Sequence, residues 1–308
     1  MTNSEQRVLV RNPASGDGQA SDRARELAVG RGYDVRDSDE PGETVDLAAA
    51  AVDEGADLVA ACGGDGTLNE VVRGVAECDA LDDVRLGVVP TGTGNDFAGN
   101  VGVQTVEHAF DVLDDGDVRR LDLGRADGRP FVNSCLGGLP AEASAQTSPT
   151  MKRRLGSMAY VLSTLQHVRT FDALRLDIRA GPEEADPVWA GEAVMLIIAN
   201  GRNLPGGDLA QSNVEDGLLD VVVIERVPSI DYLTRGAADR LLRRDVEYLT
   251  RLRVPSLAIT HDGEPVQFSL DGEMIRRARL QVDCLTGAMS FHVGEAYEPD
   301  PEERSDLQ

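Results

Sequence analysis

Short apolar runs alternate with helix-like stretches over residues 1–117. Apolar runs of this length, bounded by turn residues, indicate strands, whereas longer periodic stretches indicate helices. The alternation predicts an N-terminal α/β domain built on a doubly wound parallel sheet. Strands are expected at 7–11, 33–38, 56–61 and 84–90, and helices near 20–31, at 44–55 with Thr44 as the N-cap, and from Leu68 onward.

The pattern changes from about residue 118, where short strand candidates separated by turns replace the alternation. They predict a C-terminal antiparallel β-sandwich domain at 118–293, interrupted by helix-like insertions at 152–168 and 229–245. The acidic, proline-containing tail at 294–308 is expected to be disordered. The strand-bearing stretches are 120–134, 173–181, 188–200, 218–227, 256–273 and 279–293.

The charge of the chain limits its partners and its solvent. The formal net charge of −24 argues against nucleic acid, whose phosphates such a protein would repel. Lys152 is the only lysine, and a carboxylate-rich, lysine-poor and aromatic-poor composition is typical of proteins from extreme halophiles. An acidic protein with biased codon usage is the alternative. The charge therefore describes the solvent and leaves the reaction open.

The remaining composition favours a cytoplasmic protein. No apolar run approaches the roughly 18 residues that cross a bilayer, and the first residues lack the apolar core of a signal peptide. The four cysteines and four histidines are dispersed, which argues against a disulfide framework or a zinc site.

Three glycine-containing stretches follow the first, third and fourth predicted strands. They are NPASG (12–16), GGDGTLNE (63–70) and PTGTGND (90–96). Ligands of doubly wound sheets bind beyond the carboxyl ends of the strands, where all three stretches fall. Glycine lets the main chain approach a phosphate closely, and successive N–H groups hold it. Phosphate binding is therefore predicted, with Gly66 as the central bend.

Common phosphate-binding motifs do not account for these loops. The chain has no GxxxxGK[ST], and Gly99 lies too far from the Gly92–Gly94 pair for a dinucleotide fingerprint. Any one loop alone could be an ordinary turn between a strand and a helix. Three loops at successive strand ends favour a phosphate ligand.

The three stretches together resemble the diacylglycerol kinase catalytic family, which includes sphingosine kinases and soluble bacterial lipid kinases. The resemblance spans roughly residues 7–293. It continues in KRRLGSMAYVLSTL, similar to the helix near the family's lipid cleft, in residues 200–224, and in SLDGE at 269–273. GGDGT alone also occurs in NAD kinases and phosphofructokinases.

The resemblance implies that the loops bind ATP. Asp65 would help to organise Mg²⁺ beneath the phosphates, and Asp96 would support that loop. The implied nucleotide-lining residues are Asn12, Pro13, Ala14, Ser15, Gly16, Thr44, Gly64, Asp65, Gly66, Thr67, Leu68, Asn69, Glu70, Thr93 and Asp96.

The resemblance also implies a structural Mg²⁺ site in the second domain. Asp216 would bind the ion together with main-chain carbonyls near Leu219 and Val221. Hard oxygen ligands suit Mg²⁺, which usually keeps several waters. Taken without the family, EDGLLD is more often a turn that enters a strand.

Asp271 and Glu273 are the implied catalytic carboxylates. Their spacing places both on one face of a strand, or at its end near Gly272. One could accept the proton of the attacking hydroxyl while the other orients it, and the residues do not decide which. Without the family, an Asp-Gly turn followed by an exposed glutamate would be favoured.

The predicted function is an ATP-dependent lipid kinase that acts on a lipid alcohol, peripherally at a membrane. Pro140 replaces an aspartate usual in the family, so acceptor contacts there are in doubt. The basic residues 152–154 and Arg240, Arg243 and Arg244 could dock anionic head groups or lie on a solvated helix face. An NAD kinase-like phosphotransferase is the alternative, although its likeness is expected to stop at GGDGT. A nucleotide-binding regulator without turnover is a third interpretation. The lipid and the oligomeric state, a homodimer included, stay open.

Overall fold

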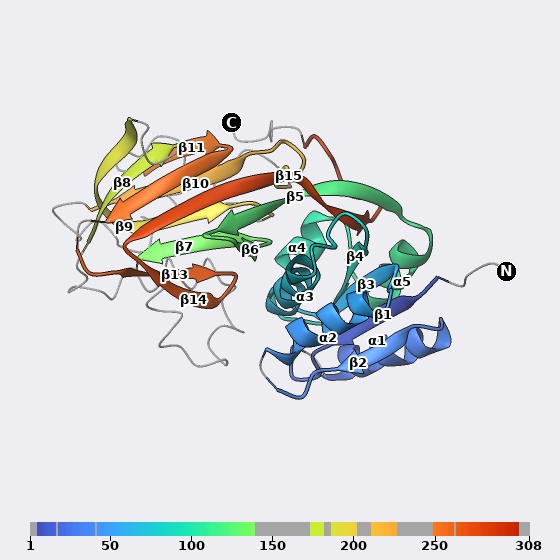
Figure 1. The fold of residues 1–308 in the computed structure, drawn as a ribbon. Helices are drawn as coiled ribbons and strands as arrows, with labels where there is room; N and C mark the ends of the chain where they lie inside the picture. Colours follow the sequence, from blue (N-terminus) through green and yellow to red (C-terminus); the bar gives the residue numbers. More distant parts are fainter. Residues whose placement is uncertain are drawn as a thin grey trace. The chain divides into compact units, whose positions relative to one another are not determined.

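The computed structural model describes residues 5–16, 18–40, 42–138, 173–181, 186–201, 211–226, 249–261 and 263–301. They fall into two compact units (Figure 1). The first unit comprises Met1–Leu123, Asn213–Asp216 and Leu285–Asp300. The second comprises Gly124–Ser212, Gly217–Cys284 and Pro301–Gln308.

A parallel sheet forms the centre of the first unit. Apolar, fully buried side chains dominate its inner strands, as expected of a sheet covered on both faces. The strand order is β2-β1-β3-β4, and the end of β15 adds in parallel through Ser290 opposite Arg85. The predicted α/β architecture is confirmed. The strands are β1 (Arg7–Arg11), β2 (Asp34–Asp37), β3 (Leu58–Gly63) and β4 (Arg85–Pro90).

The helices of the first unit form two pairs. The helix α2 packs against α3, and α1 packs against α5. The chain leaves β1 outward to β2 and returns to β3 on the other side of β1, so the strand order reverses between β1 and β3. The helices are α1 (Gly18–Gly30), α2 (Glu43–Asp53), α3 (Asp65–Glu77), α4 (Asp96–Asn100) and α5 (Val106–Asp115).

Two predicted helix starts were wrong. Gly42, with φ of 89°, is the N-cap of α2, so Thr44 lies inside the helix and caps nothing. Helix α3 begins at Asp65 rather than at Leu68. Gly66 therefore belongs to the first helical turn and forms no bend. In α3 the reason is that Asp65, Gly66 and Thr67, which have weak helix propensity, are held helical by tertiary packing.

The strands of the second unit pair in the antiparallel manner, as predicted for the C-terminal domain. The strand β9 is the hub, because it pairs with β7, β8 and β10. Strands β5 and β15 each have one part in either unit. The strands are β5 (Asp117–Ala126), β6 (Arg129–Phe131), β7 (Ser134–Gly138), β8 (Leu174–Ala180), β9 (Pro187–Ala199), β10 (Leu219–Glu225), β11 (Leu249–Val254), β12 (Ser256–His261), β13 (Val266–Leu270), β14 (Glu273–Arg277) and β15 (Arg279–Val293).

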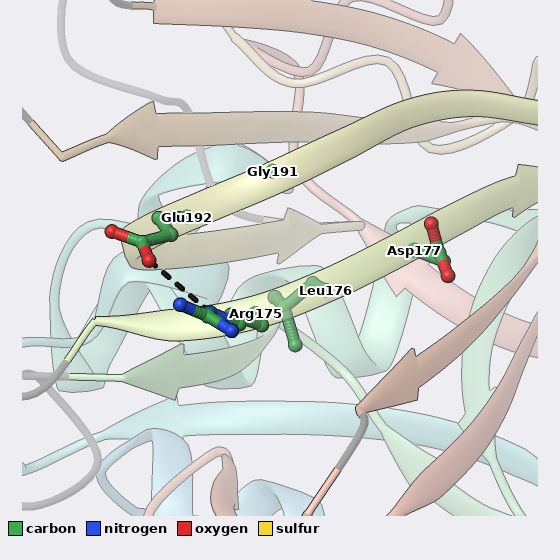
Figure 2. Close-up of a pocket in the computed structure, with 5 residues that line it drawn as sticks. All are labelled: Arg175, Leu176, Asp177, Gly191 and Glu192. Carbon is green, nitrogen blue, oxygen red and sulfur yellow. Dashed lines mark hydrogen bonds and ion pairs between the residues drawn. The ribbon is translucent and has the colours of Figure 1, made fainter.

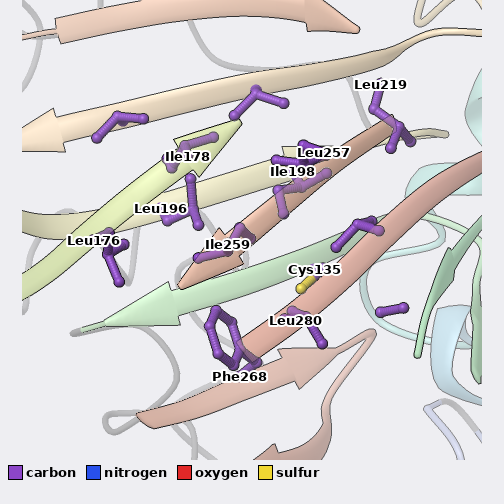
Figure 3. Close-up of a cluster of buried hydrophobic side chains, with 14 of the residues drawn as sticks. Cys135, Leu176, Ile178, Leu196, Ile198, Leu219, Leu257, Ile259, Phe268 and Leu280 are labelled. Carbon is purple, nitrogen blue, oxygen red and sulfur yellow. The ribbon is translucent and has the colours of Figure 1, made fainter. Parts of the chain in front are cut away.

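Alternate residues of these strands build the core of the second unit (Figure 3). Leu196 and Ile198 of β9 point into it, as do Leu257 and Ile259 of β12. Cys135 lies in the same cluster, where burial raises the pKa of its thiol. The four cysteines are all free, and Cys135 behaves as a small apolar residue.

The predicted division of the chain differs from the two units in three segments. Residues 118–123, 213–216 and 285–293 group with the first unit. For 285–293 the reason is that the end of β15 pairs with β4. The predicted disorder of the tail was wrong for 294–301, where Tyr297 is buried. The helical insertions predicted at 152–168 and 229–245 lie outside the described residues. Within the described part of the chain, no helix is both long and apolar enough to span a membrane.

Candidate active site

The three glycine loops of the first unit touch one another through their main chains. A Cβ atom on Gly16, which has φ of +72°, would lie 1.9 Å from the Thr91 carbonyl oxygen. A Cβ atom on Gly92 would lie 2.3 Å from the Cα atom of Gly64. Neither distance is possible for a real side chain, so only glycine permits this assembly. The loops predicted from sequence do come together.

Hydrogen bonds fix the loops relative to one another. The Ser15 hydroxyl accepts from the Gly64 N–H at 3.1 Å, and the Thr91 N–H donates to the Gly63 carbonyl at 3.0 Å. Asn95 has φ of 50°, and its side-chain amide donates to the Gly92 carbonyl at 2.8 Å. Asn95 was not among the predicted residues, although asparagine is enriched at positive φ.

Arg11, directly before the first loop, joins the end of β1 to β2 and α1. Its guanidinium, 7% exposed, donates to both carboxylate oxygens of Asp37 at 2.7 and 3.0 Å and to Asp22 at 3.1 Å. The hydrogen bond from Arg11 lowers the pKa of Asp37 despite partial burial. Arg11 was not among the residues predicted from the sequence, although an arginine at the end of a buried strand is a usable signal.

Gly66 is exposed in the first turn of α3, whereas Thr67 beside it is buried. The first intrahelical bond of α3 runs from the Leu68 N–H to the Gly64 carbonyl, so the N–H group of Gly66 lies outside the hydrogen-bond ladder of the helix. A Cβ atom on Gly66 would meet nothing within 4 Å. A helix N-terminus with accessible N–H groups is a natural anion site. The geometry therefore fits the phosphates of a nucleotide.

Asp65 joins two of the loops. Its carboxylate accepts from the Asp96 N–H at 3.1 Å and the Phe97 N–H at 3.0 Å, which caps α4. A Cβ atom on Gly94 would lie 3.2 Å from Asp65 Oδ2 and 4.0 Å from Asp96 Oδ1. Two carboxylates thus lie beside Gly94. Mg²⁺ sites on nucleotides commonly use one or two carboxylates with phosphate oxygens and waters, so these residues fit the ion.

The other predicted nucleotide contacts differ in exposure. Four of them are buried, namely Thr44, Thr67, Leu68 and Asn69, and the Leu68 N–H is already used by the helix. The contact of these four residues with nucleotide stays a prediction. Exposed or half-buried positions are Asn12, Pro13, Ala14, Ser15, Gly16, Gly64, Asp65, Gly66, Glu70, Thr93 and Asp96.

Asp271 occupies a tight turn of the second unit. It has φ of 47° and Gly272 has φ of 102°, and Leu270 pairs with Glu273 across them. This is a two-residue hairpin of the type that favours Asp-Gly. The Asp271 carboxylate accepts main-chain N–H groups from Val132 at 2.6 Å, Asn133 at 3.0 Å and Ser134 at 2.7 Å. It holds the corner between β6 and β7.

Glu273 begins β14 and is 35% exposed. Its carboxylate pairs with the guanidinium of Arg129 on β6. Both oxygens of Asp271 serve a structural corner, whereas the Glu273 side chain reaches solvent. Asp271 and Glu273 are both half-buried, and which of them accepts the proton stays a prediction.

The predicted structural cation site falls in a well-anchored segment. Glu215, next to Asp216, accepts both guanidinium N–H groups of Arg119 at 2.9 and 2.7 Å and the Tyr297 hydroxyl at 2.9 Å. Asp216 is half-buried. Among the described residues no group of three or more His, Cys, Asp or Glu side chains surrounds a metal position.

The main-chain ligands proposed beside Asp216 lie in β10. Val221 pairs with Leu252 of β11 and with Ile198 of β9, so sheet neighbours flank it on both sides. Its carbonyl could reach a cation only through a second lone pair. Asp216 belongs to the first unit and Leu219 and Val221 to the second. The Mg²⁺ site at these residues stays a prediction.

A small surface hollow lies elsewhere in the second unit, with a volume of about 250 Å³. Arg175, Leu176 and Asp177 of β8 line it together with Gly191 and Glu192 of β9 (Figure 2). Arg175 and Glu192 form an ion pair of 3.2 Å across it. No residue predicted to bind nucleotide, metal or acceptor lines this hollow.

Comparison with known proteins agrees with the two-unit architecture. The diacylglycerol kinase catalytic domain matches residues 6–126, and the domain described as "YegS C-terminal NAD kinase beta sandwich-like" matches residues 133–293. A protein of Pseudomonas aeruginosa strain PAO1 named "Probable lipid kinase YegS-like" is 33% identical over 277 residues, which cover 88% of this chain and 87% of that protein. The chain belongs to the YegS-like lipid kinase family. It is accordingly a kinase that phosphorylates a lipid.

Further relatives support the assignment of this chain to the lipid kinase family. A Stenotrophomonas maltophilia strain K279a protein, also named "Probable lipid kinase YegS-like", is 29% identical over 308 residues, which cover 95% of this chain and 97% of that protein. A crystal structure of a "putative diacylglycerol kinase" from Bacillus anthracis strain Sterne superposes with a TM-score of 0.79 at 25% identity and covers 97% of this chain and 100% of its own.

These matches correct one alternative interpretation and one expectation from the sequence. Because the chain belongs to a family of lipid kinases, the interpretation as a nucleotide-binding regulator without turnover is not supported. The expectation that the NAD kinase likeness stops at GGDGT was wrong, because the C-terminal domain is itself described as NAD kinase sandwich-like. A shared sandwich is a shared fold, and fold alone does not define the acceptor.

Proposed function

We propose that this lipid kinase transfers the γ-phosphate of ATP to the hydroxyl of a diacylglycerol-like or dialkylglycerol-like lipid. The observation that carries the proposal is the contact of three glycine loops around the open first turn of α3. Such a main-chain cradle suits the phosphates of a nucleotide. The first unit thus binds ATP, and the second activates the acceptor.

Glu273 is the proposed proton acceptor. The lipid hydroxyl gives its proton to the Glu273 carboxylate while its oxygen bonds to the γ-phosphorus, and the bond from that phosphorus to the bridging oxygen of ADP breaks. The exposure of Glu273 supports this role, and the three N–H contacts of Asp271 support a positioning role for that residue. A general base contributes typically 10²–10⁴-fold to the rate.

Mg²⁺ is the proposed metal. Asp65 and Asp96, whose oxygens lie beside Gly94, would hold it, and when bound it would neutralise charge on the phosphates. Asp216 with the Leu219 and Val221 carbonyls is a separate, structural site in this proposal. If that site exists, Mg²⁺ raises the melting temperature of the wild-type protein more than that of Asp216→Ala.

The acceptor is expected at a membrane surface. The motivation is the family, together with an apolar helix-like segment at 152–168 that begins with the basic residues 152–154, both outside the described residues. Basic residues near an anionic membrane contribute about 1 kcal/mol each in ordinary salt and less at high salt. A halophilic source would favour a dialkylglycerol over a diacylglycerol.

A transfer assay tests the function. The protein is incubated at molar salt with Mg²⁺, γ-labelled ATP and mixed micelles of dialkylglycerol, diacylglycerol or sphingoid base, and in parallel with NAD. The expected result is one labelled lipid, with transfer by Glu273→Gln slowed about 10²–10⁴-fold although this variant binds ATP normally. Label in NAD alone would overturn the lipid acceptor. Normal turnover by Glu273→Gln would overturn its role as the base.

A further inference from the structure

Two hairpins of the second unit have the same turn. Asp127 and Gly128, with φ of 47° and 83°, connect β5 and β6. Asp271 and Gly272, with φ of 47° and 102°, connect β13 and β14. In each case the residue after the turn begins the returning strand, and these residues are Arg129 and Glu273. An Asp-Gly turn is thus no catalytic signal by itself.

The two hairpins are joined by two ion pairs. Arg129 contacts Glu273 at the first residue of β14, and Arg277, the last residue of β14, donates to Asp127 at 2.7 Å. The Asp127 carboxylate also accepts the Gln281 N–H at 3.0 Å. Both ion pairs therefore link the turn region of β5 and β6 to the same strand, but only one involves the proposed base.

Arg129 lies close in sequence to the corner between β6 and β7 that Asp271 holds. Two residues separate it from Val132, whose N–H group, like those of Asn133 and Ser134, donates to Asp271. One short segment of chain therefore receives Asp271 at one end and presents Arg129 to Glu273 at the other. Any shift of this segment moves both contacts together.

We propose that Arg129 is a positioning residue that holds the Glu273 carboxylate in one orientation toward the acceptor hydroxyl. This inference rests on the proposed function, in which Glu273 accepts the proton. The guanidinium offers donors in a fixed geometry and always carries its charge. Arg129 is 47% exposed and Glu273 35%, so the pair adds little to folding stability. Its consequence is expected in turnover.

Arg129→Met removes the cation and keeps much of the side-chain length. The expected result is a kcat about tenfold or more below wild type, with KM for ATP within about twofold, because the variant leaves the first unit unchanged. Arg129→Lys should recover part of the lost kcat, since it restores the charge without the planar geometry. Arg277→Met is the matched control, because it removes the other ion pair between the same elements.

A double variant that combines Arg129→Met with Glu273→Gln distinguishes failure of this inference from failure of the proposed function. If Arg129 acts through Glu273, the double variant Arg129→Met with Glu273→Gln has the residual turnover of Glu273→Gln alone. Equal kcat values for Arg129→Met and Arg277→Met, with Glu273→Gln slowed as expected, would overturn the positioning role only. Normal turnover by Glu273→Gln would overturn the proposed base and this inference with it. The inference would also be overturned if Arg129→Met lowered kcat in the Glu273→Gln background as much as it does in the wild-type protein.

Discussion

At the scale of single residues, a substitution at Gly66 should affect ATP binding without affecting stability. Its Cβ position is open and its backbone is helical, so a side chain there costs the fold little. Gly66→Val should therefore keep the wild-type melting temperature but weaken ATP binding by about tenfold or more, because the side chain occupies space beside the first-turn N–H groups. Calorimetry measures both quantities. Gly30→Val, at an equally open helical glycine of α1, is the control, and unchanged ATP affinity in Gly66→Val would contradict the nucleotide assignment.

Asp271 and Glu273 should respond differently to loss of charge. Asp271→Asn places an amide donor against main-chain N–H donors of the β6–β7 corner, so it should lose about 1–3 kcal/mol of stability as well as turnover. Glu273→Gln should lose turnover only, because its contact with Arg129 is half-exposed. Denaturant unfolding of both variants gives the comparison. A fully stable Asp271→Asn would contradict the structural role of that carboxylate.

At the scale of elements, Arg11 joins β1 to the end of β2 and to α1. Arg11→Met should lower stability at neutral pH by about 2 kcal/mol, because it removes the buried guanidinium that donates to both oxygens of Asp37 and leaves that carboxylate only Arg25, at 3.7 Å. The pKa of Asp37 lies below its ordinary value of 3.8 in the folded state, so its pairing stabilises the fold above that pH. This stability is lost as the pH falls through the lowered folded-state pKa.

The difference in stability between wild type and Arg11→Met should therefore shrink on acidification below about 3.8. Melting temperatures of both proteins between neutral and strongly acidic pH measure it. A pH-independent difference would show that Arg11 stabilises the first unit by packing alone.

At the scale of the whole molecule, the acidic charge is unevenly distributed. The described residues of the first unit include ten arginines and thirty aspartates or glutamates, whereas those of the second include ten of each. Self-repulsion is therefore concentrated in the first unit. At about 0.1 M salt the Debye length is about 10 Å, and at 1 M it is about 3 Å. Concentrated salt should relieve repulsion mainly there.

Dilution from molar to about 0.1 M salt should thus destabilise the first unit before the second. Hydrogen exchange followed by mass spectrometry resolves the two, with β1, β3 and β4 expected to lose protection at higher salt than β9 and β10. Equal protection of both units down to low salt would contradict the prediction, and with it the interpretation of the composition as halophilic.

The sequence by itself determined the elements and the loops. Apolar runs of strand length and glycine stretches after them are local patterns, and a parallel sheet necessarily brings the carboxyl ends of its strands to one edge. Hence β1, β3 and β4 and the three loops were predicted close to where they lie. The start of α3 was missed, because Asp65, Gly66 and Thr67 have weak helix propensity.

Only the tertiary structure decided which side chains act on which. The ion pair of Arg129 with Glu273 spans 144 residues, and the contact of Asp271 with Val132 spans 139. Nothing in a local pattern specifies such partners, since they arise from how separate hairpins pack. The same holds for β15, whose end leaves the antiparallel sheet to pair with β4. In SLDGE, Asp271 contacts main-chain N–H groups at the corner between β6 and β7, whereas Glu273 contacts Arg129, and only the packing of the hairpins decides these partners.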